Sequence, residues 1–365
     1  MRRYFNLFWI LVFLIGSVIP LFHMNTSEIT EQENRTLAKL PEIKKKGKLN
    51  EGYGKEFESW LGDRFWGRDQ LIDTRFQALY KINGRIENEK AFIGDNGWMF
   101  MKSKTVNRPS IKKQREMIEK DAKILKAFAD KFKDKNIPIY LVLIPEREVL
   151  YQKYWERYYK PKPYLDYGDE ITKLLKKDTS ITIIYPKEEF ATASQQLYRK
   201  TDLHLNGFGE KKLIDYVYEM ITKKAEKKYY TEINPIKKFS GNISKLLNAY
   251  PNIQETFLNV KRSKNCSFFE KEDSNKNSGY SHTYRHSSCK KALSPKKIHI
   301  IGPCYSSRFF YAFSSYFQES EQMYNNTASK EGQNITQERI KYLYENASKN
   351  DIILLIGIGE STLYY

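Results

Sequence analysis

The sequence contains few of the residues that define several common protein classes. It has three cysteines in 365 residues, which excludes a disulfide-stapled scaffold, and no spaced set of cysteines and histidines indicates a zinc site. Its 12 prolines and 18 glycines exclude a collagen-like or Pro/Gly-rich chain. Aromatic residues make up 15%, far more than a disordered chain carries. We therefore expect a folded protein of one large domain or two modest ones.

Acidic residues are the minority among the charged side chains. There are 44 of them against 62 lysines and arginines, so the formal net charge is +18. Because lysine is spread along the chain and no known DNA- or RNA-binding motif occurs, we expect no nucleic-acid partner. Attraction to anionic lipid or acidic glycans fits the charge better, although a lysine-rich background without functional meaning explains it too.

Only one apolar run is long enough to matter for a membrane. Residues 4–22 carry no charge and come directly after Arg2 and Arg3. At about 1.5 Å per residue, this run covers a bilayer core of about 30 Å. The positive-inside rule keeps the arginines in the cytoplasm and exports the rest of the chain. We predict a single-pass anchor in the inner (cell) membrane with the bulk of the chain in the periplasm or extracytoplasmic space; a cleaved signal peptide and a buried soluble helix are the alternatives.

The rest of the chain divides by composition. Residues 1–23 are the predicted anchor, 24–53 a polar tether and 54–365 one folded domain. Helical spacing of apolar residues predicts a helix pair over 54–84, and a turn sequence predicts a hairpin over 91–101.

Apolar strands then alternate with helices in the folded domain. The strands are expected at 137–144, 181–185, 298–302 and 351–358, and the helices at 111–135, 166–177, 207–225 and 335–348. This alternation predicts an α/β fold whose mostly parallel sheet is flanked by helices. Residues 261–297 are polar and predicted to be a surface insertion. Cys266 and Cys289 flank its polar core and could pair, because export permits disulfides, which would leave Cys304 single.

Two groups of residues near predicted strand ends could carry chemistry, since sites in parallel sheets lie beyond the carboxyl ends of the strands. Asp202 and His204 precede the helix at 207, where a carboxylate could orient an imidazole; an N-cap network is the alternative. Cys304 and Ser306 come after the strand at 298–302, where helix N–H groups could bind an oxyanion. A small buried hydrophobe is the alternative for Cys304.

Eight short segments occur in an order similar to that of one enzyme family. They are residues 33–35 (ENR), 57–68 (FESWLGDRFWGR), 93–100 (IGDNGWMF), 144–145 (IP), 198–204 (YRKTDLH), 239–243 (FSGNI), 301–306 (IGPCYS) and 351–363 (DIILLIGIGESTL). Together they resemble the SGNH-hydrolase-like O-acetyltransferases of the AlgX/AlgJ type and the related DHHW-like group. The resemblance covers most of the chain after the predicted anchor.

This resemblance implies an SGNH-like fold and a triad. His204 would be the general base, Asp202 its orienting partner and Cys304 the nucleophile, with Ser306 as the alternative nucleophile. The backbone N–H of Tyr305 would form part of the oxyanion hole. The implied reaction moves an acetyl group to hydroxyls of a cell-envelope polysaccharide through an acyl-enzyme, with a membrane-bound O-acyltransferase as acetyl donor and with no cofactor or metal.

The chain also departs from the family pattern at several positions. The departures are Pro303 for Asp or Thr, Cys304 for the serine nucleophile, Leu205 for Trp, Asn242 for Asp, and Ser361 for Arg. A thiol beside an imidazole is a competent nucleophile, whereas several departures together suit a catalytically inactive relative. Three functions stay open: acetyl transfer, removal of acetyl groups by a glycan O-acetyl esterase of the same fold, and an inactive anchored protein that binds or assembles polysaccharide.

Overall fold

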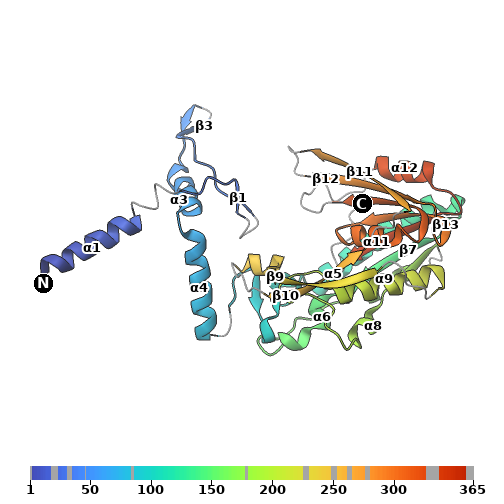
Figure 1. Cartoon of the computed structure of the whole chain (residues 1–365), viewed down its shortest axis with the longest axis horizontal. Coiled ribbons are helices and arrows are strands. Elements are labelled where there is room, and N and C mark those ends of the chain that lie inside the picture. Colours follow the sequence, from blue (N-terminus) through green and yellow to red (C-terminus); the bar gives the residue numbers. More distant parts are fainter. Residues whose placement is uncertain are drawn as a thin grey trace. The chain divides into compact units, whose positions relative to one another are not determined.

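The protein is described from a computed structural model, which places residues 2–17, 24–30, 35–45, 47–83, 86–176, 180–224, 230–247, 253–260, 265–275, 280–325 and 337–358. Two compact units share the chain (Figure 1). The first comprises residues 1–102, 200–202 and 239–253, and the second comprises residues 103–199, 203–238 and 254–365. Each unit therefore combines segments that are far apart in the sequence.

The first unit contains the predicted helix pair and hairpin. Its elements are α1 (Arg2–Ser17), β1 (Ile29–Thr30), β2 (Arg35–Thr36), β3 (Lys44–Lys45), β4 (Lys48–Leu49), α3 (Tyr53–Arg64), α4 (Arg68–Asn83), β5 (Ala91–Ile93), β6 (Met99–Met101) and α10 (Asn242–Leu246). Strands β5 and β6 pair antiparallel around a turn in which Asn96 has a φ of 54° and Gly97 a φ of 74°. Their buried side chains pack against Ile243 and Leu247 at α10, so this helix belongs to the hairpin's core.

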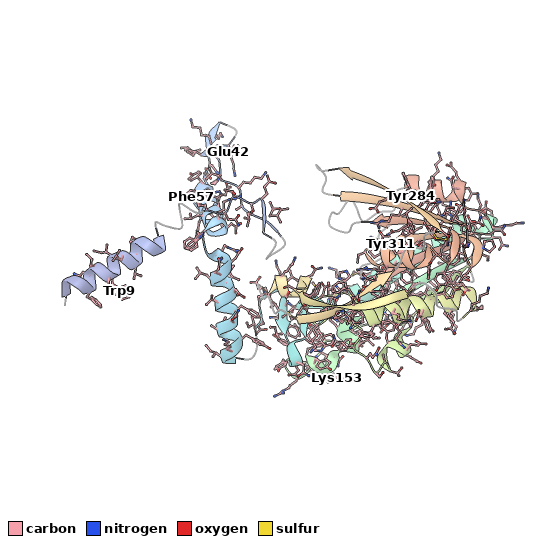
Figure 2. All side chains as sticks on the ribbon, in the orientation of Figure 1. Trp9, Glu42, Phe57, Lys153, Tyr284 and Tyr311 are labelled. Atoms are coloured by element: carbon pink, nitrogen blue, oxygen red, sulfur yellow. A yellow bond between two sulfur atoms is a disulfide. The ribbon has the colours of Figure 1, made fainter. Side chains whose placement is uncertain are left out.

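The predicted anchor falls only partly on described residues. Helix α1 covers Arg2–Ser17, and its apolar side chains are exposed in the isolated chain, for example Phe5 at 61% and Trp9 at 54%. Trp9 is labelled in Figure 2. Residues 18–22 of the apolar run lie outside the described residues. In the part of the chain that the structure places, no helix has both the length and the hydropathy needed to cross a bilayer.

The second unit is built on a sheet that has seven strands among the described residues, in the order β11-β12-β14-β13-β15-β7-β8. The strands are β7 (Ile139–Ile144), β8 (Ile181–Ile184), β11 (Cys266–Asn275), β12 (Tyr280–Cys289), β13 (Ser294–Gly302), β14 (Phe317–Asn325) and β15 (Ile352–Ile358). Strands β14, β13, β15, β7 and β8 run parallel, and the hairpin β11–β12 extends them antiparallel. The expected mostly parallel α/β sheet is confirmed.

Helices cover both faces of this sheet (Figure 1). They are α5 (Ile111–Lys131), α6 (Arg147–Leu150), α7 (Tyr167–Leu175), α8 (Lys187–Ala191), α9 (Gly207–Thr222), α11 (Tyr305–Phe313) and α12 (Gln337–Asn346). Alternate side chains of β15 point to opposite faces of the sheet. Those of Ile353 and Leu355 pack in one cluster with α5, α7 and α12. On α9 and α11, Tyr218 and Phe313 bring their ring centroids to 6.3 Å. Two further strands, β9 (Tyr230–Phe239) and β10 (Ile253–Val260), form a separate pair.

Two features of the sheet differ from the sequence-based expectations. The 261–297 segment, expected as a surface insertion, contributes strands β11 and β12 to the central sheet. Its two cysteines form the disulfide that the sequence analysis named as possible, with an S–S distance of 2.01 Å. Strand β14 was not expected, because its sequence is polar. Its side chains are nevertheless buried: Ser320 and Gln322 are fully buried and Glu321 is 3% exposed. Hydrogen bonds to neighbouring strands and to α11 satisfy these groups, which hydropathy cannot reveal.

Candidate active site

Cys304 lies where the central strand β13 passes into helix α11. Gly302, the last residue of β13, has a φ of 157°, and a Cβ there would lie 2.7 Å from the Cβ and 2.9 Å from the carbonyl oxygen of Ile356 on β15. Only glycine permits this approach. Cys304 is the N-cap residue of α11 and is partly exposed. The thiol is therefore at the carboxyl edge of the parallel sheet, where such folds place their chemistry.

His204 is positioned by the loop between α8 and α9. The loop is closed at its ends by a β-bridge between Tyr198 and Leu205, and the backbone N–H of Arg199 donates to the carbonyl of His204 at 3.1 Å. Asn206 caps α9, accepting from the N–H groups of residues 208 and 209 at 3.0 Å each. The N-cap role considered for the Asp202–His204 region is thus held by Asn206, which leaves the imidazole available for the site.

The structure brings His204 and Cys304 together across 100 residues of sequence. The Nε2 atom of His204 lies 3.1 Å from the Sγ atom of Cys304. At this distance the imidazole can accept the thiol proton, and the resulting thiolate is the nucleophilic form of cysteine. The arrangement has the geometry of a nucleophile with its base.

Tyr305, the residue after Cys304, contacts the loop that carries His204. Its hydroxyl accepts a hydrogen bond of 2.6 Å from the backbone N–H of Leu205, and its ring centroid lies 5.4 Å from that of His204. Burial raises the pKa of the Tyr305 hydroxyl well above its usual value, so the group stays neutral. The Tyr305 N–H begins α11 and has no acceptor within the helix, as expected for a first-turn donor that could face an oxyanion.

The Ser306 side chain is buried and does not face the pocket solvent. Its hydroxyl is fully buried, donates to the carbonyl of Gly302 at 3.0 Å and accepts from Nε2 of Gln322 at 2.7 Å. Gln322 in turn accepts from Arg285 at 2.8 Å. These bonds connect the start of α11 to strands β14 and β12. The geometry favours Cys304 over Ser306 as nucleophile.

Asp202 belongs to the first unit, whereas His204 belongs to the second. The Asp202 carboxylate is 4% exposed and accepts a hydrogen bond of 3.1 Å from the backbone N–H of Asn242. A Cβ at Gly241 would lie 2.6 Å from the Cβ of Asp202 and 2.3 Å from the carbonyl oxygen of Thr201. The 239–243 segment is therefore fitted closely to this carboxylate. The role of Asp202 in orienting His204 stays a prediction.

A pocket of about 440 Å³ opens in front of the thiol and the imidazole. Its lining adds residues that the sequence reasoning did not assign to the site: Arg199, Glu210, Arg285, Ser307, Arg308 and Tyr311. Tyr311 is labelled in Figure 2. Burial raises the pKa of Glu210, and the charges of Arg308, Arg199 and His204 oppose that shift. The spacing of Arg308, four residues after Cys304 on one helix, is the signal that could have identified it.

In the described ranges, no group of three or more His, Cys, Asp or Glu side chains is arranged to hold a metal ion. The pocket instead offers a thiol, an imidazole and several guanidinium groups. This chemistry suits acyl transfer to or from an oxygen nucleophile.

Comparison with known families identifies the domain that contains this pocket. The family model for the SGNH hydrolase-like domain of acetyltransferase AlgX matches residues 91–356. The chain belongs to this family. The AlgX-family match includes His204 and Cys304 and confirms the resemblance seen in the sequence motifs. The search of curated proteins found no significant match to this chain.

Two solved structures with TM-scores above 0.5 share this fold at low sequence identity. A DHHW family protein from Eubacterium siraeum DSM 15702 has a TM-score of 0.54 at 11% identity, over 74% of this chain and 92% of that chain. Bacillus cereus PatB1, in a structure with a sulfonyl adduct, has a TM-score of 0.51 at 12% identity, over 74% and 94%. The O-acetyltransferase domain of Pseudomonas putida AlgJ has a TM-score of 0.48 at 14% identity, over 73% and 90%.

Proposed function

We propose that this AlgX-family chain is an O-acetyltransferase that carries an acetyl group on Cys304 and passes it to hydroxyls of a cell-envelope polysaccharide. The observation that supports this reaction most directly is the 3.1 Å approach of His204 Nε2 to Cys304 Sγ. Both residues line an open pocket that is large enough to admit a sugar ring. Family membership independently supports acetyl transfer.

In the first half-reaction the thiol attacks the acetyl ester of the donor. His204 takes the thiol proton as Sγ forms a bond to the acetyl carbon, and the carbonyl electrons move to oxygen. The first N–H of α11, from Tyr305, stabilises that oxyanion. When the carbonyl re-forms, the ester C–O bond breaks and the imidazolium gives its proton to the leaving oxygen. The product is an acetyl thioester on Cys304.

The second half-reaction transfers this acetyl group to the acceptor. His204 takes the proton of a sugar hydroxyl while its oxygen bonds to the acetyl carbon. The C–S bond then breaks, and the proton returns to the sulfur. The proposed role of Asp202 is to fix the tautomer of His204 and to stabilise its charged form in both steps. Water in place of the sugar would give hydrolysis by the same route.

The cellular setting is part of the proposal. The apolar run of residues 4–22 would anchor the chain in the membrane, with the catalytic unit on the extracytoplasmic side. A membrane-bound O-acyltransferase would supply the acetyl group there. The disulfide between Cys266 and Cys289 fits an oxidising compartment. Protease protection of the full chain in inverted and right-side-out vesicles tests the orientation.

The test of the chemistry uses the fact that Cys304 is the free cysteine of the chain, since Cys266 and Cys289 are paired. The full-length protein is incubated with p-nitrophenyl acetate and analysed by intact-protein and peptide mass spectrometry without reduction. We expect one acetyl group on Cys304, released by neutral hydroxylamine as a thioester is, and absent after His204→Ala.

Two variants act as controls for this experiment. Cys304→Ala removes the acetyl group, while Ser306→Ala retains it, because the Ser306 hydroxyl is buried and hydrogen-bonded. A folded wild-type protein that never acetylates Cys304 would contradict the mechanism and favour an inactive binding protein. Rapid loss of the thioester to water, unchanged by any added saccharide, would favour the esterase.

A further inference from the structure

A buried carboxylate lies beside the pocket that holds the thiol and the imidazole. Glu210 is in the first turn of α9 and lines the same pocket as His204 and Cys304. Its side chain is 4% exposed, and its Oε2 atom is buried and accepts no hydrogen bond from the residues that the structure describes. A molecule in the pocket has little access to this carboxylate, so its effect on the site comes through its charge.

The fold fixes the position of Glu210 relative to His204. A Cβ at Gly209 would lie 2.1 Å from the carbonyl oxygen of Leu197, so the first turn of α9 fits closely against the loop that precedes it. Asn206 caps this turn with two hydrogen bonds of 3.0 Å each. The N-terminal end of a helix has a partial positive charge, which favours an ionised carboxylate there.

Two guanidinium groups lie near this carboxylate. The Nε atom of Arg308 is 3.6 Å and the Nη2 atom of Arg199 is 3.9 Å from Oε1 of Glu210, which makes both contacts ion pairs longer than a hydrogen bond. Arg199 has further partners, including the ring of Phe257, whose centroid lies 3.9 Å from the guanidinium carbon. The Arg308 side chain is 39% exposed against 8% for Arg199, so Arg308 is the cation that a substitution can remove with less disturbance.

The charge of Glu210 reaches both sides of the site. Burial raises the pKa of Glu210, whereas the charges of Arg308, Arg199 and His204 oppose that shift. Burial also raises the pKa of Tyr305, and the charge of Glu210 adds to this effect. Because a Coulomb interaction is mutual, the carboxylate stabilises an imidazolium at His204 as much as the imidazolium stabilises the carboxylate. In the proposed reaction such an imidazolium forms twice, close to two guanidinium groups that disfavour it.

We propose that Glu210 is a positioning residue that acts through His204: its charge offsets the neighbouring guanidinium groups and holds the transferred proton on the imidazole until the leaving group takes it. This role deepens the proposed function and rests on it for its meaning in acetyl transfer. Cys304 and His204 remain the groups that form bonds and move the proton. A carboxylate disfavours loss of a proton from a thiol and from an imidazolium alike, and a guanidinium favours both, so Glu210 and Arg308 have opposite effects on the pair.

The experiment measures how alkylation of Cys304 in the full-length protein depends on pH. Cys304 is the free cysteine, since Cys266 and Cys289 are paired. Iodoacetamide carries no charge and reacts with the thiolate, and intact-protein mass spectrometry without reduction follows the single adduct. The midpoint of the rate–pH profile reports the charges around the thiol and the imidazole, and no acetyl donor or acceptor is needed.

The expected shifts have opposite signs for the two partners. Glu210→Gln should move the midpoint lower by about one pH unit, the order expected for a unit charge several ångströms away in a partly enclosed site. Arg308→Gln should move it higher by a similar amount, and Glu210→Gln/Arg308→Gln should return it to the wild-type position because the two effects cancel. Glu210→Asp should stay closer to the wild type than Glu210→Gln. Glu219→Gln is the control: it removes the same charge from an exposed position of α9 outside this pocket and should leave the midpoint unchanged.

A purely structural role for Glu210 gives a different result. Alkylation by Glu210→Gln that changes at every pH without a shift of the midpoint, or a shift that Arg308→Gln does not cancel, overturns the proposal. Thermal melting checks that each variant is folded. Should Glu210→Gln alone fail to fold, Arg308→Gln and the double variant differ by the same charge, and equal midpoints in these two proteins overturn the proposal.

Failure of this role is distinguishable from failure of the proposed function. Acetylation of Cys304 by p-nitrophenyl acetate, together with a midpoint that does not depend on Glu210, supports the function and overturns the positioning role. A midpoint that depends on Glu210 in a protein that never forms acetyl-cysteine supports the effect of Glu210 on the thiol–imidazole pair, while the proposed function fails.

Discussion

Replacing Gly302 by alanine perturbs the turn that presents the nucleophile. The new Cβ would lie 2.7 Å from the Cβ and 2.9 Å from the carbonyl oxygen of Ile356, and the φ of 157° is one that side chains other than glycine rarely adopt. Because two of the contacted atoms belong to the neighbouring strand's backbone or are fixed to it, neither can rotate away. The strain must move β13, β15 or the start of α11.

The magnitude is the sum of two costs. An unfavourable backbone conformation costs about 1–3 kcal/mol, and overpacking of a close-packed interior costs about 1–3 kcal/mol. The free energy of unfolding should therefore fall by about 4 kcal/mol, a large share of the stability of an ordinary domain. Ile356→Ala should not rescue the variant, since alanine keeps the Cβ and the backbone that cause the clash.

Urea denaturation monitored by circular dichroism measures this loss, with an unchanged slope as the sign that only stability has changed. Acetylation of Cys304 by p-nitrophenyl acetate measures the displacement of the thiol, and we expect it to slow at least tenfold. Gly62→Ala is the matched control, because a Cβ at Gly62 in helix α3 meets nothing within 4 Å. Alanine there should raise stability by about 0.5–1 kcal/mol.

A Gly302→Ala protein as stable and as reactive as the wild type would refute this reasoning. It would mean that β13 and β15 can separate without cost and that the turn before Cys304 does not define the thiol's position. Loss of reactivity with full stability would instead show that the strain is released entirely into the start of α11.

Three further outcomes are expected. Replacing Cys266 and Cys289 by serine opens a covalent loop with a sequence separation of 23, which should cost about 3 kcal/mol by loop entropy and should lower the melting temperature in calorimetry. In a second measurement, Glu321→Gln should destabilise the protein at neutral pH: burial would raise the pKa of Glu321, but hydrogen bonds from His299 and a lysine lower it to about 2. The stabilisation, about 3 kcal/mol by that shift, is present above pH 4.5 and is lost as the pH falls toward 2, so wild type and variant should converge in acid denaturation. Third, Ser306→Ala should retain acetylation but lose about 1 kcal/mol in urea denaturation, because it removes hydrogen bonds and leaves no charge unpaired; abolished acetylation would move the nucleophile to Ser306.

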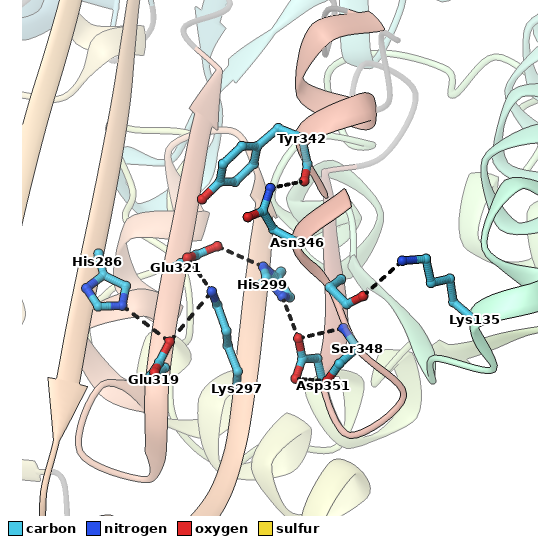
Figure 3. A network of polar contacts seen from close by, with 11 residues as sticks. Lys135, His286, Lys297, His299, Glu319, Glu321, Tyr342, Asn346, Ser348 and Asp351 are labelled. Carbon is cyan, nitrogen blue, oxygen red and sulfur yellow. Dashed lines mark hydrogen bonds and ion pairs between the residues drawn. The ribbon is translucent and has the colours of Figure 1, made fainter. Parts of the chain in front are cut away.

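His299, shown with its partners in Figure 3, adds a second pH dependence to the stability of the protein. Burial alone would lower the pKa of His299, but hydrogen bonds to Asp351 and Glu321 outweigh it and raise the pKa above 6.5. The Nδ1 atom lies 2.9 Å from Glu321, and Nε2 lies 3.2 Å from Asp351. Stability from the protonated ring is therefore present below pH 6.5 and lost as the pH rises through the folded pKa.

The interior apolar strands were predictable because their sequences are continuous runs of large aliphatic residues. The run at 137–144 became β7, and the run at 351–358 became β15, both buried on two faces. Strand β14 was not predictable, because Glu321 and Gln322 are buried through specific partners on β13 and α11. Hydropathy and residue spacing cannot predict such a strand, because the partners that bury its polar side chains are distant in sequence.

For the site as well, some features follow from the sequence and others only from the tertiary structure. The sequence by itself determined the motif order and the candidate residues Cys304, His204 and Asp202, because motifs and their spacing are read from consecutive residues. Only the tertiary structure decided that His204 meets Cys304, that Ser306 is buried in hydrogen bonds and that Arg285 reaches the pocket from an inserted hairpin. These contacts join residues up to 100 positions apart, and such distances are set by the packing of the whole sheet and its helices.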